Sequence, residues 1–397
     1  MKLYNKKSQF SSQLQKFVNS FTNGMSKPIK DRFISLVVSL MTSESGVSAD
    51  LARRINTTIK NASMRTNLYR FFNNKNFNQD LFYKNFIITV IQKIKFKHNN
   101  AYITIDHTFE KNEFVTIMFT LRINNQGIPI FFRSAKTKEF CKNNQKELDD
   151  RIKVFDGDLI INAITEVSSY FKDKNVNLIF LADRWFPNLS VLNHIDKLGH
   201  KYVFRLKQDS NLGVFTKLRE TDFNKAWHTL SEIKPKKHCG KYIRDLIFGK
   251  EEKYKANLAI AMAKKTQDPW YLITNMEPEK AVATYSYRFG AIECLFKNTK
   301  SNGFRLEKSR IKNIKAFQVL YCLMCFCVVL SNYLALKYIK NKHHHDLDIT
   351  YCRRTKNGKS ERIMSNFKLG LTIFQLIIND IENLIKYKLD ASFVMSF

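Results

Sequence analysis

The stretch VNLIFLAD, residues 176–183, decides the fold of this chain, because it is a run of apolar residues that closes with an aspartate. Such a continuous run predicts a buried strand. Residues 188–199, NLSVLNHIDKLG, follow with a helical period and a closing glycine, and residues 201–207, KYVFRLK, are the next expected strand. Strand, helix and strand in this order are typical of an α/β sheet.

Further strands and a helix are expected upstream of this stretch. AYITID at residues 101–106 predicts a strand that ends at Asp106, and EFVTIMFTLRI and IPIFFRS flank NNQG, which predicts a hairpin. A helical period over residues 159–171 completes the pattern of a mixed α/β sheet flanked by helices. Asp106 and Asp183 each close an expected strand, and α/β sheets place their chemistry at the carboxyl ends of strands.

The segments on either side of this sheet have different patterns. Residues 1–99 are expected to be all-helical, and a helix, a Gly-containing turn and a second helix there are compatible with a helix-turn-helix. Arg65 and Arg70 lie on a short expected helix and are DNA-binding candidates. The expected domains are a helical DNA-binding domain (1–99), a first part of the α/β core (100–207), a β-rich insertion (208–266), a second part of the core (267–340) and a helical tail with a dimerisation role (341–397).

The charge of the chain is strongly basic and unevenly distributed. With 66 Lys and Arg against 35 Asp and Glu, the formal net charge is +31, which favours a polyanionic partner or an anionic membrane surface. Residues 1–100 carry 17 basic and 4 acidic side chains, whereas residues 101–200 carry 13 of each. Such a neutral segment between basic ones is expected where acidic groups gather at a site within a nucleic-acid-binding surface.

The uncharged run at residues 316–336 is long enough to span a bilayer. It is solitary and contains Gln318, Ser331 and Asn332, so we expect a buried core helix, with a membrane anchor as the alternative that cell fractionation would test. The cysteines show no spacing of a disulfide framework, and we expect no signal peptide and a reducing cytoplasm.

A single glutamate, Glu293, lies in the basic stretch YSYRFGAIECLFKNTKSNGF at residues 285–304. One helix is expected over residues 277–303. On it, Lys297 and Lys300 share the face of Glu293, where they could hold a phosphate backbone. Together with the two strand-end aspartates, this glutamate predicts a three-carboxylate site for Mg²⁺ or Mn²⁺, with two ions expected. Two such ions activate a water or a 3′-hydroxyl for in-line phosphoryl transfer. For each carboxylate taken alone, the alternative is a cap, a turn or a solvated ion pair.

These residues resemble the DDE transposases of bacterial insertion sequences, in the group marked by a Tyr-Arg-Glu-Lys signature. Asp106 in TIDHT resembles the first Asp of the triad, Asp183 in FLADRWF the second, and Glu293 in FGAIECLFKNTKS the Glu. The order of segments matches over essentially the whole chain. The resemblance implies a helical end-binding domain, an RNase H-like catalytic core, a β-rich insertion and a helical tail.

The signature residues are matched with one departure in spacing. Tyr285, Arg288 and Lys300 resemble the Tyr, Arg and Lys, but four residues separate Arg288 from Glu293 where the common pattern has three. On a regular helix this rotates Arg288 away from the Glu293 face. Either Gly290 marks a local bulge, or Arg288 approaches DNA from before the turn.

The resemblance also gives a role to Trp270, which opens the expected strand WYLIT. It is similar to a tryptophan that stacks, in relatives, on a base flipped out near the end of the element. The alternative is a tryptophan packed at the start of a strand.

The implied function is that of a transposase of a bacterial transposable element. It would bind the terminal inverted repeats, cleave each end with its metal-bound carboxylates, and join the freed 3′-hydroxyl to target DNA, or first to the opposite strand as a hairpin. Double-stranded DNA at the element ends and the target is the expected partner. A homodimer is expected in the DNA complex, with a helix at 369–389 as a dimer surface, and the location is cytoplasmic and nucleoid-associated.

No nucleotide cofactor is expected, because NGKS at residues 357–360 lacks the earlier glycine of a P-loop, a position that Arg353 takes. Two alternatives to the transposase are a catalytically inactive or domesticated DNA-binding relative and an RNase H-like nuclease without strand transfer. Metal-dependent nicking would separate the first, and strand-transfer products the second.

Overall fold

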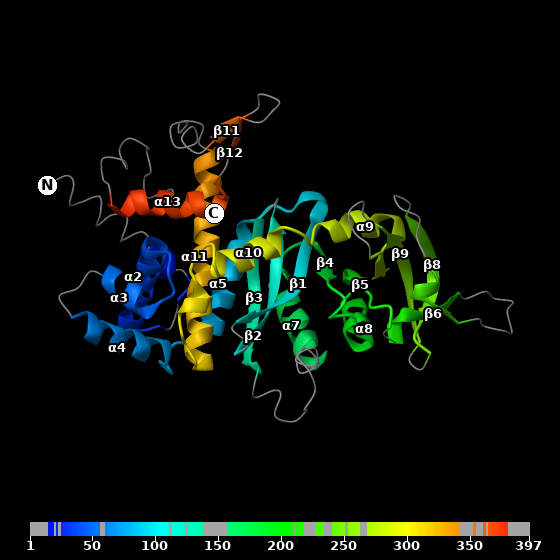
Figure 1. The fold of residues 1–397 in the computed structure, drawn as a ribbon, viewed down its shortest axis with the longest axis horizontal. Coiled ribbons are helices and arrows are strands. Elements are labelled where there is room, and N and C mark those ends of the chain that lie inside the picture. Colours follow the sequence, from blue (N-terminus) through cyan, green and yellow to red (C-terminus); the bar gives the residue numbers. More distant parts are fainter. Residues whose placement is uncertain are drawn as a thin grey trace. The chain divides into compact units, whose positions relative to one another are not determined.

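The computed structural model divides the chain into two compact units. One is formed by Lys95–Glu293, and the other by Met1–Ile94 together with Cys294–Phe397 (Figure 1). The residues that the structure describes are 15–19, 21–22, 25–55, 60–110, 113–123, 126–137, 157–209, 211–217, 227–233, 240–250, 253–262, 268–340, 352–354, 360–362 and 364–379.

The unit Lys95–Glu293 is built on one mixed sheet. Its strands are β1 (Asn100–Glu110), β2 (Phe114–Ile123), β3 (Gln126–Lys136), β4 (Asn177–Ala182), β5 (Lys201–Arg205), β6 (Val214–Lys217), β7 (His228–Thr229), β8 (Lys241–Phe248), β9 (Tyr254–Ala261) and β10 (Trp270–Thr274). Its helices are α7 (Gly157–Ser169), α8 (Leu189–Lys197) and α9 (Pro278–Ser286), with 3₁₀ turns η1 (Lys97–Asn99), η3 (Asn211–Gly213) and η4 (Leu230–Glu232).

Ten described strands form this sheet in the order β3-β2-β1-β4-β5-β10-β9-β8-β6-β7. β1, β2 and β3 are antiparallel neighbours, whereas β4 pairs parallel with β1, and β5 pairs parallel with β4. β10 returns antiparallel to β5, and the strands of residues 208–266 extend the same sheet beyond it. The predicted mixed α/β sheet with flanking helices is therefore confirmed.

Apolar residues at alternate positions of β4 pack against helices on the two faces of the sheet. Ile179 and Leu181 of β4 point to one face, where they form a buried cluster with Ala281 and Tyr285 of α9. Phe180 points to the opposite face and packs against His200, whose ring nitrogen is 3.0 Å from the hydroxyl of Ser168 in α7. A strand that is apolar and buried from Leu178 to Ala182 is thus covered on both faces.

The strand that carries Asp106 is longer than predicted. We expected it to end at Asp106, but β1 continues to Glu110, because β2 pairs with it as far as Glu110 opposite Phe114. The parallel pairing with β4 does end where predicted, at Ile105 opposite Ala182. Asp106 therefore lies at the edge of the parallel part of the sheet, although it is inside its strand.

The helix predicted through the signature stretch is broken in two. α9 ends at Ser286 and α10 begins at Ala291, ending at Thr299. The chain turns between them, and Gly290 has a φ of +85°, a left-handed conformation that is open to glycine and that ends a regular helix. The prediction of one continuous helix was wrong, since the periodicity continues across a turn that only the glycine indicates.

The other unit is helical. Its described helices include α2 (Lys27–Ser43), α3 (Ser48–Arg54), α4 (Asn61–Phe72), α5 (Gln79–Lys93), α11 (Ile314–Lys340) and α13 (Asn366–Asn379), with the 3₁₀ turn η5 (Leu306–Lys308) and a small hairpin of β11 (Cys352–Arg354) and β12 (Ser360–Arg362).

The apolar helix α11 is the centre of the helical unit. It packs against α2, α4, α5 and α13, and Phe326 lies within 6.4 Å, between ring centroids, of five other phenylalanines, among them Phe33 and Phe86. α13 crosses α11 closely, since a Cβ at Gly370 would lie 1.8 Å from the carbonyl oxygen of Ser331.

The predicted core helix is confirmed. Among the described residues, one helix, Ile314–Ile339, is long and apolar enough to cross a membrane by length and composition, and it is mostly buried inside the protein. Cys322, Cys325 and Cys327 are buried free thiols within it. This burial is consistent with a soluble protein.

The predicted domain boundaries stay a prediction. α11 belongs to the helical unit, whereas the sequence pattern assigned residues 314–340 to the second part of the α/β core. The predicted dimer helix at 369–389 is described only as far as Asn379, and most of the NGKS segment, residues 357–359, lies outside the described residues.

Candidate active site

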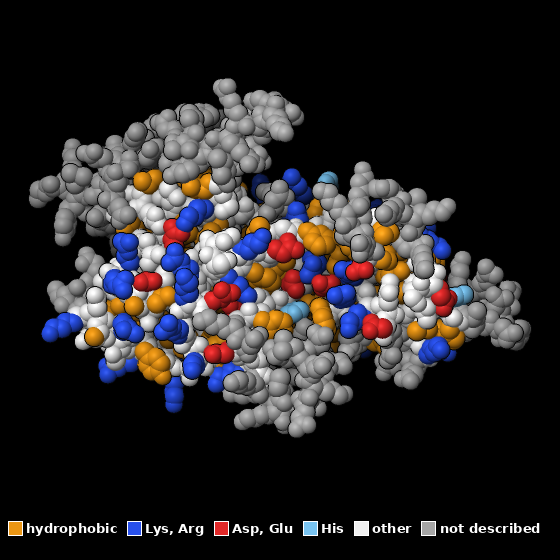
Figure 2. Space-filling view, viewed as in Figure 1, with side chains coloured by type: hydrophobic (Ala, Val, Ile, Leu, Met, Phe, Trp, Pro, Cys, Tyr) orange, Lys and Arg blue, Asp and Glu red, His pale blue; other side chains and the backbone are white. Residues whose placement is uncertain are grey.

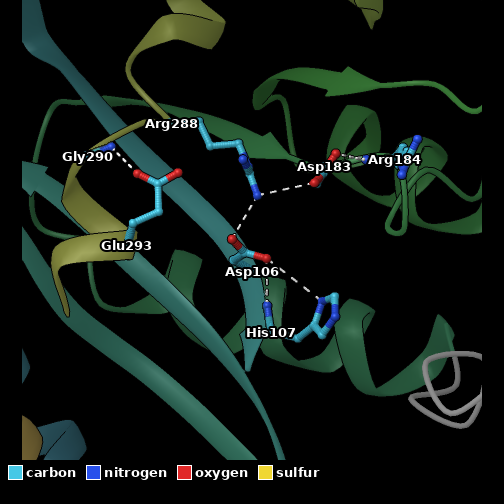
Figure 3. Close-up of polar contacts among 7 residues, drawn as sticks. All are labelled: Asp106, His107, Asp183, Arg184, Arg288, Gly290 and Glu293. Atoms are coloured by element: carbon cyan, nitrogen blue, oxygen red, sulfur yellow. Dashed lines mark hydrogen bonds and ion pairs between the residues drawn. The ribbon is translucent and has the colours of Figure 1, made fainter. Parts of the chain in front are cut away.

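The side chains of Asp106 and Asp183 lie together at the edge of the sheet, and both contact the guanidinium of Arg288. The register of β1 and β4 places Asp106 directly after Ile105 and Asp183 directly after its partner Ala182. The Arg288 guanidinium lies between them, with one nitrogen 2.7 Å from Oδ2 of Asp106 and 3.5 Å from Oδ2 of Asp183 (Figure 3). Two residues predicted as ligands and one predicted as a DNA contact are therefore neighbours in one small site.

Backbone donors fix the other oxygen of each aspartate. The backbone N–H of His107 donates to Oδ1 of Asp106 at 2.9 Å, and the backbone N–H of Arg184 donates to Oδ1 of Asp183 at 2.6 Å. Each carboxylate thus has one oxygen held by the next residue of its own chain and the other directed to Arg288 (Figure 3). The two side chains are oriented before any ligand arrives.

Burial makes this a costly place for negative charge. The side chain of Asp106 is 16% exposed and that of Arg288 is 9% exposed. Burial raises the pKa of Asp106 to about 6, against the lowering effects of Arg288 and of the His107 N–H, and the charges of Asp183 and Glu293 raise it further. The site therefore favours a positive charge among its carboxylates.

His107 lies beside this pair without carrying charge. Its Nδ1 is 3.8 Å from Oδ1 of Asp106, too far for a hydrogen bond, and burial lowers the pKa of its imidazole to about 4. The ring is therefore neutral near pH 7. Its neighbours are apolar rings, with Phe109 and Phe186 at centroid distances of 5.2 Å and 5.9 Å.

Glu293 is the third residue of α10, and its side chain turns back to the start of the helix. Its Oε2 accepts a hydrogen bond from the backbone N–H of Gly290 at 2.5 Å, as a glutamate does in a capping box (Figure 3). Its charge still raises the pKa of Asp106. Glu293 therefore caps its helix and adds negative charge to the site.

The turn between α9 and α10 explains the shifted spacing of Arg288. The backbone N–H of Arg288 donates to the carbonyl of Tyr285, and that of Phe289 to the carbonyl of Ser286, so the chain tightens before Gly290. The extra residue is taken up in this turn and not on a helix face. Arg288 consequently points into the sheet edge towards the aspartates.

Tyr285 and Trp270 belong to the packing next to the turn. Tyr285 is fully buried in the cluster under α9, and burial raises the pKa of its hydroxyl. Trp270 is half-buried, stacks on Phe289 at 5.3 Å and 23°, and meets Tyr285 edge to face at 5.4 Å. Phe289 thus covers one face of the Trp270 ring.

The remaining predicted DNA contacts belong to the helical unit. Lys297 is exposed on α10, and Lys300 follows the end of that helix, with its backbone N–H donating to the carbonyl of Phe296. Arg65 and Arg70 are exposed on α4.

The sequence analysis missed several residues near the carboxylates. Arg122 of β2 donates to the backbone of the turn that carries Arg288. Trp185 lies two residues after Asp183, and the Nζ of Lys207 is 4.9 Å from the centroid of its ring. Trp185 could have been noticed for its place beside Asp183, but Arg122 had no signal, because it is 165 residues from its partner Tyr287.

The donor chemistry of the site fits a divalent cation. Carboxylate oxygens are the ligands that Mg²⁺ and Mn²⁺ prefer, and the raised pKa of Asp106 reflects the need for positive charge there. Among the described residues, however, no group of three or more His, Cys, Asp or Glu side chains is close enough together to hold a metal ion. Arg288 supplies the positive charge instead.

The family comparison agrees with this site. Residues 161–330 match the family model of the transposase DDE domain. The matched range includes Asp183, Arg288 and Glu293 and begins after Asp106. This match indicates a transposase, an enzyme class that cleaves and transfers DNA strands and generally uses divalent metals.

Other comparisons add nothing to this assignment. No curated protein matches the chain. A crystal structure of Marinitoga piezophila Argonaute in complex with a 5′ OH guide RNA is similar over 59% of this chain, at 13% identity and a TM-score of 0.23. This chain spans about a third, 34%, of the length of that Argonaute.

Replacing Asp106 with asparagine is expected to remove a pH-dependent loss of stability. The folded pKa of about 6 exceeds the unfolded value of 3.8, so the native state binds more protons between these values and wild-type stability falls as pH rises through them. Asp106→Asn should therefore gain about 1–3 kcal/mol over wild type at pH 7, and little at pH 4.5. Urea unfolding in EDTA across this range measures it. If the free energies of unfolding of the two proteins changed with pH in parallel, the raised pKa of Asp106 would be contradicted.

Removing Arg288 is expected to destabilise the metal-free protein and to make it respond to metal. Arg288→Gln leaves two carboxylates without their cation, at a cost of about 2 kcal/mol. Added Mn²⁺ should then raise the melting temperature of this variant more than that of wild type. The control is Arg244→Gln, which removes an exposed ion pair with Glu279 at 2.7 Å and should cost under about 1 kcal/mol with no metal response. An Arg288→Gln variant as stable and as metal-insensitive as the control would contradict the role of Arg288.

Proposed function

We propose that this chain is the transposase of an insertion sequence and that Asp106, Asp183 and Glu293 form its catalytic triad. It would bind the terminal inverted repeats, hydrolyse a strand at each end and transfer the freed 3′-hydroxyl by transesterification. The observation that carries this proposal is the convergence of Asp106 and Asp183 on one buried cation, in a chain with a transposase DDE domain.

The sheet supports an RNase H-like assignment of the core. Its first five strands are ordered β3-β2-β1-β4-β5, with β1 to β3 antiparallel and β4 and β5 parallel to β1. Asp106 lies on β1 and Asp183 directly follows its neighbour β4, at the edge where the parallel pairing ends. That edge is where α/β sheets place ligands.

Asp106 and Asp183, with Glu293, would hold the divalent cations, Mg²⁺ or Mn²⁺, and two ions are proposed. When bound, the metal stabilises the charge of the attacking and leaving oxygens of phosphoryl transfer. The backbone N–H groups of His107 and Arg184 keep the aspartates in place, and neutral His107 adds no positive charge that would compete with a cation. Arg288 neutralises the carboxylates until metal and DNA arrive, and would then turn to a DNA phosphate.

The helical unit offers a surface for the element ends. The outer face of α4 carries Arg65, Tyr69 and Arg70, with Tyr69 63% exposed, and its sequence contains no acidic residue. Figure 2 shows Lys and Arg side chains gathered over α2, α3 and α4. An exposed helix with arginines and an aromatic ring suits contact with DNA phosphates and a groove.

The other signature residues complete the proposed DNA contacts. Lys297 and Lys300 would bind the DNA backbone, and Tyr285 supports the turn that carries Arg288. Trp270 would stack on an extruded base once Phe289 leaves its ring face. Because two ends must be joined, the working form is proposed to be a homodimer on DNA, with the segment 369–389 as a dimer surface.

Cleavage of the element's own end tests the catalytic proposal. A labelled duplex of the end, taken from the DNA that flanks the gene, is incubated with Mg²⁺ and wild type, Asp183→Asn or Asp173→Asn. Asp173 is an exposed aspartate shortly before β4 begins, at the end of the strand opposite to Asp183. We expect Asp183→Asn to bind normally but to cleave roughly 10²- to 10³-fold more slowly, as is typical when a group that stabilises transition-state charge is lost, and Asp173→Asn to match wild type.

The products separate the related functions. Joining of the cleaved end to a second duplex supports the transposase, and cleavage without joining supports a nuclease on the same fold. Binding without cleavage by wild type, with Mn²⁺ also tried, would refute the catalytic triad and indicate a non-catalytic DNA-binding relative.

Salt dependence tests the proposed surface on α4. Arg65→Ala combined with Arg70→Ala should weaken binding to the end and reduce the slope of log K against log salt by about 2, one for each phosphate contact. Fluorescence anisotropy at several salt concentrations measures the slope. The control, Lys93→Ala with Lys312→Ala, removes the same charge from exposed positions outside α4. An equal loss of slope in both double variants would mean that α4 has no special part in binding.

A further inference from the structure

The turn that carries Arg288 is held by an arginine from a distant strand. Nη1 of Arg122, near the end of β2, donates to the carbonyl of Tyr287 at 2.6 Å and to the carbonyl of Phe289 at 3.1 Å. These are the carbonyls on either side of Arg288. One guanidinium nitrogen therefore holds the peptide group that precedes Arg288 and the one that joins Phe289 to Gly290.

Two further contacts bind the same turn to the β2–β3 hairpin. The Arg122 guanidinium lies 5.1 Å from the ring centroid of Tyr287, and that ring packs against Tyr102 of β1 at 4.6 Å. A Cβ at Gly127, at the start of β3, would lie 2.7 Å from the carbonyl oxygen of Ala291. The hairpin thus contacts both the turn and the first residue of α10.

The turn needs such a support. The last carbonyls of a helix lack partners within the helix, and those of Tyr287 and Phe289 face the hairpin as the chain leaves α9. Gly290 has a left-handed φ of +85°, and an added Cβ there would find no atom within 4 Å, so packing does not fix this residue. A glycine in open space is free to change conformation unless its neighbours are held.

We propose that Arg122 is a positioning residue of the active site, which acts through the Tyr287–Gly290 turn on Arg288 and Glu293. With the turn held, Arg288 reaches Asp106 and Asp183, and Glu293 caps α10 from the N–H of Gly290. The catalytic part of this inference rests on the proposed function, whereas the structural part does not depend on DNA.

The structural part is tested without DNA by the fluorescence of Trp270. The chain has three tryptophans, so Trp185→Phe with Trp227→Phe leaves Trp270 as the reporter, and its ring stacks on Phe289 within the turn. In this background, Arg122→Ala should shift the emission to longer wavelength and increase quenching by acrylamide, with the melting temperature nearly unchanged. Arg122→Lys, which keeps a donor for the carbonyls, should restore part of the signal.

A matched control removes another arginine from the same sheet. Arg133 of β3 lies 4.6 Å over the ring of Phe131 and 3.5 Å from Glu166, away from the turn. Arg133→Ala should leave the Trp270 signal as in the parent protein. Trp270 fluorescence that does not respond to Arg122→Ala, or responds equally to Arg133→Ala, would overturn the proposal whatever the protein does to DNA.

The catalytic part is tested by a double-mutant cycle on end cleavage. Arg122→Ala should lower kcat about 10- to 100-fold, as misplacement of a catalytic group does, with KM for DNA little changed. Because part of its effect runs through Arg288, Arg122→Ala combined with Arg288→Ala should lose less activity than the product of the two separate losses. Additive losses, or a rise in KM without a fall in kcat, would overturn the proposal in favour of a direct DNA contact.

The fluorescence and cleavage experiments distinguish a failure of the proposed function from a failure of the positioning role of Arg122. A wild-type protein that does not cleave its end refutes the proposed function and leaves the fluorescence result to decide whether Arg122 holds the turn. A wild-type protein that cleaves, together with an Arg122→Ala variant that cleaves equally well, refutes the positioning role alone.

Discussion

The contact of the Arg288 guanidinium with Asp106 and Asp183 is the interaction on which the rest of the site depends. Two carboxylates at a sheet edge, one of them 16% and the other 25% exposed, repel each other and are poorly solvated. A cation between them reduces both penalties. Burial still outweighs Arg288 and raises the pKa of Asp106 to about 6, so a single guanidinium does not fully compensate the charge. A site of this kind favours a cation of higher charge.

Three separate features of the chain bring these groups together. The register of β1 and β4 aligns the aspartates, the break at Gly290 redirects Arg288 from a helix face to the sheet edge, and Arg122 holds the break from the neighbouring hairpin. None of them is sufficient alone. A register shift of one residue would turn Asp106 to the other face, and a continuous helix would turn Arg288 away.

The sequence predicted those parts that local pattern determines. The buried strand before Asp183 is continuously apolar, and the rule for strand ends then indicated Asp106 and Asp183 as neighbours, which the structure bears out in their shared contact with Arg288. The apolar helix α11 was predicted as a core helix because its polar residues and its solitary place disfavoured a membrane span, and it is mostly buried. The buried strand and the core helix are each indicated by residues that are close together in the sequence.

Features that depend on distant partners were not predictable in this way. The continuation of β1 to Glu110 depends on its pairing with β2, and the helix break depends on a glycine that a helical period can hide. The pairing of Arg288 with the aspartates and the hold of Arg122 on the turn join residues more than 100 positions apart. An arginine in a basic chain gives no sign of which carbonyl or carboxylate it will reach.

A crystal structure of the protein with a duplex of its element's end and Mn²⁺, recorded to show the anomalous signal of manganese, tests directly whether the aspartates hold the metal. We predict an anomalous peak bound by Asp106 and Asp183, with the Arg288 side chain moved away from them. An absence of manganese at the aspartates, with Arg288 still between them and DNA bound, would contradict it.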